Sequence, residues 1–245
     1  MSNPQPSELP SLFSRNNVAV ITGAASGIGR AAAQRCAAAG MRLVLFDRDA
    51  TALADLAQAL PVEVRHLAGD VSRMEDVERL RDVAFESFGA VAVLMNNAAI
   101  SGTGSDNWTG LEAWRRIMDV NLWGVVHGVH AFTPRLLGQA SRSAIINTGS
   151  KQGITNPPGF PAYAVAKAGV RTLTEQLAHG LIVRLRHQNV SRVRAWVDHP
   201  CWTFRLSVQS LLLLRGQLDV HSNLLPLYSI RLRGRRTDLT SRTFC

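Results

Sequence analysis

Hydrophobic positions along the chain follow two spacings that alternate from residue 17 to residue 148. Short apolar runs bounded by turns are followed by longer segments in which apolar residues recur every three or four positions. The short runs are typical of buried strands, and the longer segments of amphipathic helices. Strands that alternate with helices indicate βαβ units. The predicted fold is therefore α/β, a doubly wound parallel sheet in a three-layer α/β/α arrangement.

The predicted elements have the following bounds. Strands are expected at Val18–Ile21, Arg42–Phe46, Val62–Leu67, Val91–Met95 and Ala144–Asn147. Helices are expected at Ile28–Ala39, Ala50–Leu60, Arg73–Phe88, Leu111–Leu137 and Tyr163–Leu185. Pro134 is expected to kink or end the fourth helix, because proline lacks the N–H of the helical ladder. Sheets of this kind bind ligands beyond the carboxyl ends of their strands, where the strand order reverses.

Charge divides the chain into two parts. Residues 1–180 hold 14 Arg and 2 Lys against 15 acidic residues, a net charge of +1, whereas residues 181–245 hold 11 Arg against 3 Asp, a net charge of +8. We therefore predict a flexible N-terminal arm over residues 1–16, a folded domain over 17–187, and an atypical Arg-rich segment over 188–245. The basic segment lacks the interleaved aromatic residues that stack on bases, so nucleic acid is an unlikely partner.

Cysteine content and hydropathy bear on the location of the protein. The three cysteines lie far apart and are odd in number, which suggests a reduced, cytoplasmic protein rather than a disulfide framework. The polar first 17 residues lack the apolar core of a signal peptide. No apolar run reaches the roughly 18 residues that a membrane span needs. We therefore expect no membrane association.

A glycine-rich turn follows the first predicted strand and opens the first helix. Its sequence, from Thr22 to Gly29, is TGAASGIG. Glycines at these spacings allow a tight turn and a close backbone approach to a pyrophosphate, whose charge the free amides at the helix start attract. The residues predicted to bind the cofactor here are Gly23, Ser26, Gly27, Ile28 and Gly29. A turn that merely needs glycine for its conformation is the alternative interpretation.

Acidic residues follow the second and third predicted strands. Asp47 lies 18 residues beyond Gly29, where a carboxylate accepts hydrogen bonds from the ribose hydroxyls of NAD and repels the additional phosphate of NADP. NAD is therefore the predicted cofactor and NADP the less likely one, although the adjacent Arg48 could pair with that phosphate. Asp70 and Val71 are predicted to contact the adenine. The alternative for Asp47 is a solvated turn residue, and for Asp70 a helix cap.

Candidate catalytic residues follow the fifth predicted strand. Ser150 comes after the fifth strand, and Tyr163 and Lys167 lie four residues apart on the helix that follows, hence on one face. Tyrosine ordinarily has a pKa of about 10, and a fixed ammonium nearby favours its phenolate form. A serine hydroxyl can then hold a substrate oxygen while the tyrosine gives or takes a proton. His127 and His130, three apart on a helix, are expected to pack or face solvent rather than bind zinc, and no metal is expected.

The ordered set of motifs resembles the short-chain dehydrogenase/reductase family, whose sheet is Rossmann-like. The motifs are the glycine turn, Asp70, Asn97-Ala98-Ala99, Asn121, Ser150 and Tyr163-x-x-x-Lys167. The resemblance covers about residues 17–180, and one departure is Ala99, where the family usually has glycine. It implies that the domain over 17–187 is a dinucleotide-binding and catalytic domain. It implies an oxidoreductase that transfers hydride between nicotinamide and a secondary alcohol or ketone, and it implies a homodimer or homotetramer.

The resemblance also assigns roles to single residues. Ser150 would orient the substrate carbonyl or hydroxyl, and Tyr163 would be the general acid/base. Lys167 would bind the nicotinamide ribose and favour the phenolate, and Asn121 would anchor a water that links Lys167 to solvent. Asn97, Ala98 and Ala99 would line the cofactor site. The hydride itself moves between cofactor and substrate, so the protein supplies orientation and proton management.

The C-terminal region departs from the family pattern. The segment Ser191–His199 carries Arg192, Arg194, Asp198 and His199, which would need partners inside a sheet, so no sixth strand is expected there. Cys201 stands where the family has glycine after Pro200. The favoured interpretation is a reading-frame shift, and a divergent substrate region or an acquired basic arm are the alternatives. The alternative function is accordingly a catalytically impaired dinucleotide-binding relic.

Overall fold

The computed structural model describes residues 12–101, 110–188 and 193–198, which belong to one compact unit. Its strands are β1 (Val18–Thr22), β2 (Arg42–Asp47), β3 (Val64–Ala68), β4 (Val93–Asn96), β5 (Ser143–Thr148) and β6 (Val193–Asp198). Its helices are α1 (Gly27–Ala38), α2 (Ala50–Ala59), α3 (Met74–Phe88), α4 (Leu111–Met118), the π-helix η1 (Asp119–Trp123), α5 (Gly124–Gly138), α6 (Gln152–Thr155) and α7 (Pro161–Gln188).

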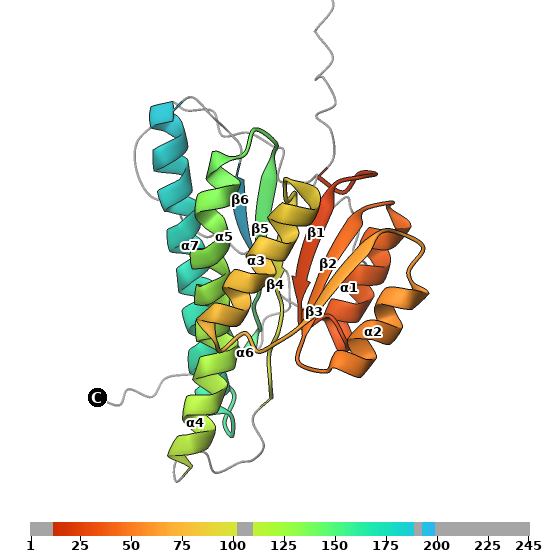
Figure 1. Cartoon of the computed structure of the whole chain (residues 1–245). Coiled ribbons are helices and arrows are strands. Elements are labelled where there is room, and N and C mark those ends of the chain that lie inside the picture. Colours follow the sequence, from red (N-terminus) through yellow and green to blue (C-terminus); the bar gives the residue numbers. More distant parts are fainter. Residues whose placement is uncertain (1–11, 102–109, 189–192, 199–245) are drawn as a thin grey trace, which may run out of the picture. The chain divides into compact units, whose positions relative to one another are not determined.

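All strands pair in parallel, in the order β3-β2-β1-β4-β5-β6 (Figure 1). The chain runs outward from β1 to β3, then returns to pair β4 with the other edge of β1. The order therefore reverses between β1 and β4, which is the point where such sheets open a crevice for ligands. The predicted doubly wound α/β fold is confirmed.

Two apolar cores lie on opposite faces of the sheet, because successive side chains of a strand point to opposite faces. Val18 and Val20 of β1 belong to the core that α3, α5 and α7 cover, whereas Ala19 and Ile21 belong to the core that α1 and α2 cover. This double burial explains why β1 is apolar at nearly every position. The strands are thus fixed on both faces, and their carboxyl ends form a rigid edge.

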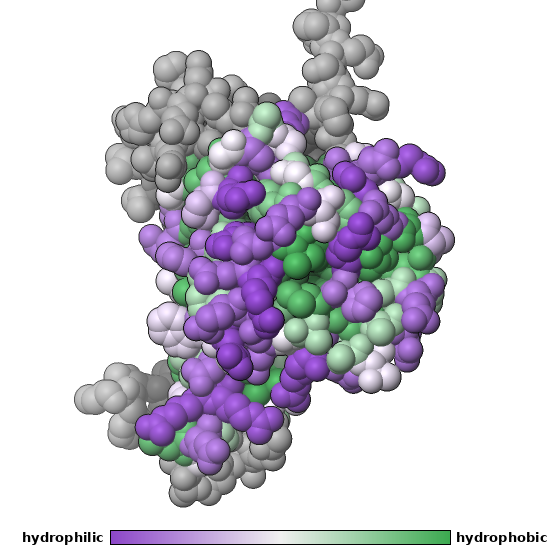
Figure 2. Space-filling model, viewed as in Figure 1, coloured by the Kyte–Doolittle hydropathy of each residue, from purple (hydrophilic) through white to green (hydrophobic). Residues whose placement is uncertain are grey.

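Helix α3 shows how an amphipathic sequence places the outer layer. Val77, Leu80, Ala84 and Phe85 are buried against the sheet, while Glu75, Arg79 and Glu86 are exposed. In the view of Figure 1, α3 lies in front of the strands, and its outward surface is mainly hydrophilic (Figure 2). The three-residue and four-residue spacing of the apolar positions is the physical cause of this orientation.

The helices differ from the sequence predictions in three respects. Pro134 does not end its helix, since α5 continues to Gly138. The helix from Leu111 onward is not uniform, because η1 inserts a wider π-helical turn between α4 and α5. The short helix α6 was not expected.

The expectation that Ser191–His199 forms no strand was wrong. Residues Val193–Asp198 form β6, which pairs in parallel with β5 over six positions. The prediction was based on the charged side chains of the segment, which would need partners inside a sheet. A parallel pair of strands is instead held by backbone N–H and C=O groups, which every residue of the segment supplies. The family's later elements would lie in residues 199–245, outside the described residues, so that part of the prediction stays a prediction.

Close packing of α5 on β4 gives a test of the fold. A methyl group added at Gly128 would collide with Oδ1 of the buried Asn96, whereas one added at Gly180 on α7 would meet nothing within 4 Å. Gly128→Ala is expected to lower the free energy of unfolding by about 1–3 kcal/mol. Gly180→Ala, the control, is expected to raise it by up to about 1 kcal/mol, because alanine favours helix. Urea unfolding of both variants measures this, and equal effects would contradict the packing of α5 on β4.

Candidate active site

The glycine turn joins β1 to α1 and leaves no room for a side chain at Gly23 or Gly29. Gly23 has a φ of 65°, and a Cβ there would lie 2.7 Å from the Cα of Ala98. A Cβ at Gly29 would collide with the carbonyl oxygen of Gly23. Ser26 precedes α1 in an extended conformation, and its side chain makes no capping hydrogen bond. The first amides of α1 are therefore available to an anionic ligand.

Side-chain hydrogen bonds tie the end of β1 to the end of β4. The Thr22 hydroxyl oxygen accepts from the backbone N–H groups of Asn97 (2.9 Å) and Ala98 (3.1 Å). The Asn97 amide group donates to the carbonyl of Thr22 (3.1 Å), and its Oδ1 accepts from the hydroxyl of Thr148 (3.3 Å). Asn97 is thus a structural bridge between the ends of β1, β4 and β5.

Asp47 ends β2 and faces the glycine turn. Its Oδ2 accepts from the backbone N–H of Ala25 (2.9 Å), and its Oδ1 accepts from the N–H of Asp49 (3.1 Å). These bonds fix the carboxylate beside the turn without using all of its acceptor positions. The adjacent Arg48 lines, together with Asp47, the cleft that is described below.

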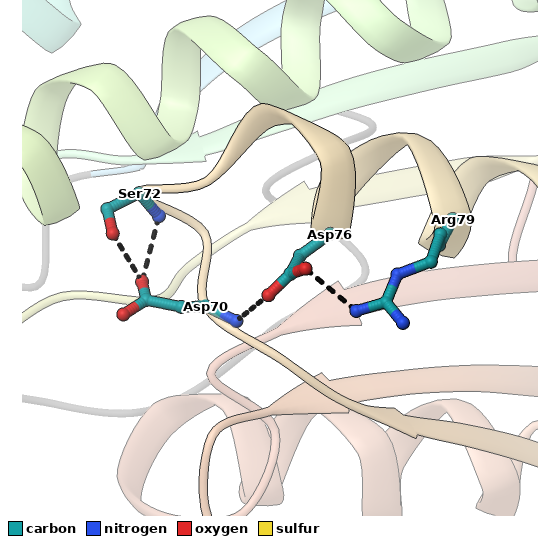
Figure 3. Close-up of polar contacts among 4 residues, drawn as sticks. All are labelled: Asp70, Ser72, Asp76 and Arg79. Atoms are coloured by element: carbon teal, nitrogen blue, oxygen red, sulfur yellow. Dashed lines mark hydrogen bonds and ion pairs between the residues drawn. The ribbon is translucent and has the colours of Figure 1, made fainter.

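Asp70 and Val71 form a turn after β3 that two polar residues support (Figure 3). Asp70 Oδ1 accepts from the N–H and the hydroxyl of Ser72, at 2.9 and 2.8 Å. The N–H of Asp70 donates to Oδ2 of Asp76 (2.9 Å), and Oδ1 of Asp76 pairs with Arg79 at 2.7 Å. The Asp70 N–H and then the Arg79 guanidinium hold the pKa of Asp76 below its ordinary value. The first turn of α3 therefore anchors the backbone of Asp70.

Tyr163 and Lys167 project from the first turns of α7, which begins at Pro161. Lys167 is 2% exposed, and its Nζ donates to the carbonyl of Thr148 at 2.7 Å. Burial lowers the pKa of Lys167 from 10.5 to about 8, because the charged form loses its hydration. The same Nζ lies 5.8 Å from the centroid of the Tyr163 ring. The predicted ammonium–phenol pair is therefore present as a pair of neighbours.

Ser150 lies between β5 and α6, where its hydroxyl oxygen accepts from the N–H of Gln152 (3.2 Å). It does not belong to the residues that line the cleft described below. Helix α6 packs closely on α7, since a Cβ at Gly153 would lie 2.6 Å from the backbone nitrogen of Ala168. The segment that carries Ser150 is thus held against the turn of α7 that carries Lys167.

Asn121 is fully buried in the π-helix η1. Its Oδ1 accepts from the N–H of Ile100, and its Nδ2 donates to the carbonyl of Ile100, both at 2.8 Å. Asn121 thus holds the chain after β4 in the manner of a backbone ladder. Irregular π-helical turns of this kind are frequent at functional sites.

These elements enclose one cleft of about 410 Å³ at the carboxyl ends of the strands. Of the predicted residues, it is lined by Gly23, Ser26, Gly27, Ile28, Asp47, Asp70, Val71, Asn97, Ala98, Ala99, Tyr163 and Lys167. Gly29, Asn121 and Ser150 do not line it. Residues not singled out from the sequence also line it, namely Phe46, Gly69, Ile100, Val120, Thr148 and Gly149. One feature of the sequence could have pointed to the residues that support the cleft. Thr22 and Thr148 are polar residues at the ends of otherwise apolar, buried strands.

The described residues offer neither a metal site nor a membrane span. No group of three or more His, Cys, Asp or Glu there could hold a metal ion. No helix in that part of the chain combines the length and the hydrophobicity of a membrane span.

Comparison with known proteins gives consistent matches. The sequence profile of the short chain dehydrogenase family matches residues 17–190. A putative oxidoreductase SadH from Mycobacterium tuberculosis is 40% identical over 186 residues, which are 75% of this chain and 65% of SadH. A meso-2,3-butanediol dehydrogenase from Serratia marcescens is 38% identical over 169 residues, 67% of this chain and 66% of that enzyme. The chain thus spans less than two thirds of SadH.

A solved structure supports the same relationship. A short chain dehydrogenase/reductase from Burkholderia phymatum, crystallised in complex with NAD, superposes with a TM-score of 0.70 at 40% identity. The superposition covers 76% of this chain and 65% of the Burkholderia chain.

The buried lysine predicts a pH dependence of stability. Below pH 8, Lys167 is protonated in both the folded and the unfolded chain, so the folded state carries the full cost of burying the charge. Between pH 8 and 10.5 the unfolded chain binds more protons, and wild-type stability rises relative to Lys167→Met, by on the order of 3 kcal/mol. Urea unfolding at pH 7 to 10.5 measures this difference.

The exposed Lys151 supplies the control for that experiment. Lys151→Met should differ from the wild type by a nearly constant amount over the same pH range. If the stability difference between the wild type and Lys167→Met were equally constant over this pH range, the claim that burial lowers the pKa of Lys167 would be refuted.

Proposed function

The chain belongs to the short-chain dehydrogenase family, and from this premise we propose that it is an NAD-dependent oxidoreductase acting on a secondary alcohol or the corresponding ketone. The observation that carries the proposal is that the glycine turn, Asp47, Tyr163 and Lys167 line one cleft. These residues come from the turn that opens α1, from the end of β2 and from α7, and the reversal of the strand order brings them together. The named dehydrogenase among the relatives, which acts on butanediol, supports the class of substrate.

The residues of the cleft fit a dinucleotide. The approach of Gly23 to Ala98 and of Gly29 to Gly23 leaves bare backbone at the start of α1, which suits a pyrophosphate. Asp47 presents a fixed carboxylate for ribose hydroxyls, and the Asp70–Val71 turn borders the place for the adenine. Tyr163 and Lys167 then border the nicotinamide end. NAD, when bound, would accept or supply the hydride.

The residues at the nicotinamide end would handle the proton. The Tyr163 hydroxyl would take a proton from the alcohol or give one to the ketone. Lys167 uses one of its three N–H donors on Thr148, which leaves two for a ribose hydroxyl and a water. Its positive charge would favour the phenolate of Tyr163. The Ser150 hydroxyl, held beside α7, would hydrogen-bond the substrate oxygen.

We assign Asn121 a role through the backbone. Both polar groups of its side chain are engaged by Ile100, so a water linking Lys167 to solvent would be held by the main chain of η1. The side chain would keep η1 and residue 100 in place around that water. This assignment keeps the proton route predicted from the sequence and changes the atom that supports it.

Several expectations from the sequence stay predictions. A homodimer or homotetramer and a cytoplasmic location rest on the family resemblance and on cysteine usage. The alternative of a catalytically impaired relic concerns residues 199–245, which lie outside the described part, and turnover by the purified protein decides it. The assignment of residues 188–245 to a separate atypical segment also stays a prediction.

Removal of the Tyr163 hydroxyl tests the acid/base assignment. Tyr163→Phe is expected to lower turnover by about a hundredfold to ten-thousandfold, because only the proton transfer is lost. The dissociation constant for NAD should change less than about threefold. NADH formation with a panel of secondary alcohols measures the first quantity, and calorimetric titration measures the second. Wild-type turnover in the variant would exclude Tyr163 as the acid/base.

Cofactor preference tests the assignment of Asp47. Wild-type protein is expected to bind NAD more tightly than NADP, because the Asp47 carboxylate repels a 2′-phosphate. Asp47→Ala should narrow or reverse this preference. Asp55→Ala, which removes an exposed carboxylate of α2, should leave it unchanged. Titration of each protein with both cofactors gives the ratio of the dissociation constants for NADP and NAD. Tighter binding of NADP by the wild type would overturn the assignment.

A further inference from the structure

A histidine outside the cleft holds the turn that borders the adenine end. His127 of α5 hydrogen-bonds through Nδ1 to the backbone carbonyl of Val71, at 2.9 Å, across 56 positions of sequence. Val71 is 6% exposed and lines the cleft, whereas His127 is not among the lining residues. The contact therefore connects the adenine-side wall of the cleft to a helix behind it.

Helix α5 also touches the Val71 side chain. A Cβ at Gly124 would lie 2.7 Å from Val71 Cγ2, so the glycine lets the first turn of α5 approach that side chain closely. His127 lies three residues further along α5, one turn away on the same face. The helix thus contacts Val71 twice, by packing on its side chain and by bonding its carbonyl.

A second helix holds the neighbouring residue from another element. Asp76 of α3 accepts from the N–H of Asp70 (Figure 3), while His127 donates to the carbonyl of Val71. Two consecutive residues are therefore fixed by side chains of two helices. Loss of either bond would leave a backbone group without its partner and loosen the turn.

The direction of the bond defines the state of the imidazole. A carbonyl only accepts, so Nδ1 of His127 carries a hydrogen, in the neutral ring or in the imidazolium. Asparagine places its Nδ2 donor at a similar distance from the backbone, so His127→Asn can keep the bond. Alanine removes it. This pair of substitutions separates the hydrogen bond from the rest of the side chain.

We propose that His127 is a positioning residue for the adenine end of the cofactor, because it sets the place of Val71 without touching the ligand. The inference rests on the proposed function, since it takes the cleft as an NAD site. His127 then contributes to the affinity for the adenine half of the cofactor and not to the affinity for the nicotinamide half. The catalytic end, on α7 and β5, is independent of this contact.

Calorimetric titration of His127→Ala, His127→Asn and wild type with NAD, ADP-ribose and nicotinamide mononucleotide tests this. The dissociation constants of His127→Ala for NAD and ADP-ribose are expected to rise about tenfold, the effect of one hydrogen bond. His127→Asn should restore them to within about threefold of the wild type. The constant for nicotinamide mononucleotide should not change. In turnover assays, KM for NAD should rise in His127→Ala while kcat at saturating NAD is kept.

The control is His130→Ala, which removes an exposed histidine one turn further along α5 and should leave all constants unchanged. Unchanged NAD affinity in His127→Ala, an equal loss for nicotinamide mononucleotide, or no recovery in His127→Asn would each overturn the proposal. If His127→Ala does not fold, His127→Gln, whose donor is displaced by one bond, takes its place with the same expectation. No NAD binding by the wild type would instead refute the proposed function, and this inference with it.

Discussion

The close approach of the carboxyl ends of β1 and β4 is the constraint on which the cleft depends. Gly23 lies so near Ala98 that no side chain fits between them, and Thr22 and Asn97 exchange hydrogen bonds across the same gap. The chain leaves β1 toward one face of the sheet, through α1, and continues after β4 toward the other, through α5. The crevice opens where these two paths diverge. Every other wall of the cleft is placed relative to this junction.

Polar groups around the cleft are buried at a cost that the fold offsets with hydrogen bonds. The buried Asn121 and the partly buried Asn97 use their amide groups on backbone groups, and the buried Lys167 donates to the carbonyl of Thr148. The lowered pKa of Lys167 shows that its bond does not fully replace water. A lysine destabilised in this way is a strong donor for any partner that enters the cleft. Part of the fold's stability is thus given up where the proposed chemistry needs a charged group.

The sequence predicted most of the fold and the lining of the cleft because local chemistry determines both. Apolar strands buried on both faces, glycines in a tight turn and Tyr163 four residues before Lys167 are visible without tertiary information. The contacts that tertiary packing decides were not predictable. The hydrogen bonds of Asn121 to Ile100 depend on the π-helix η1, and the hydrogen bond of His127 to Val71 depends on the packing of α5 against the turn after β3. β6 was missed because its charges were weighed against burial, whereas its pairing with β5 is made by the backbone.

The measurement that tests the account most directly is the crystal structure of the protein with NAD. We expect the pyrophosphate to lie against the first amides of α1, the adenine beside Asp70 and Val71, and the nicotinamide beside Tyr163 and Lys167. NAD bound outside this cleft, or bound in it with its two ends exchanged, would contradict the account.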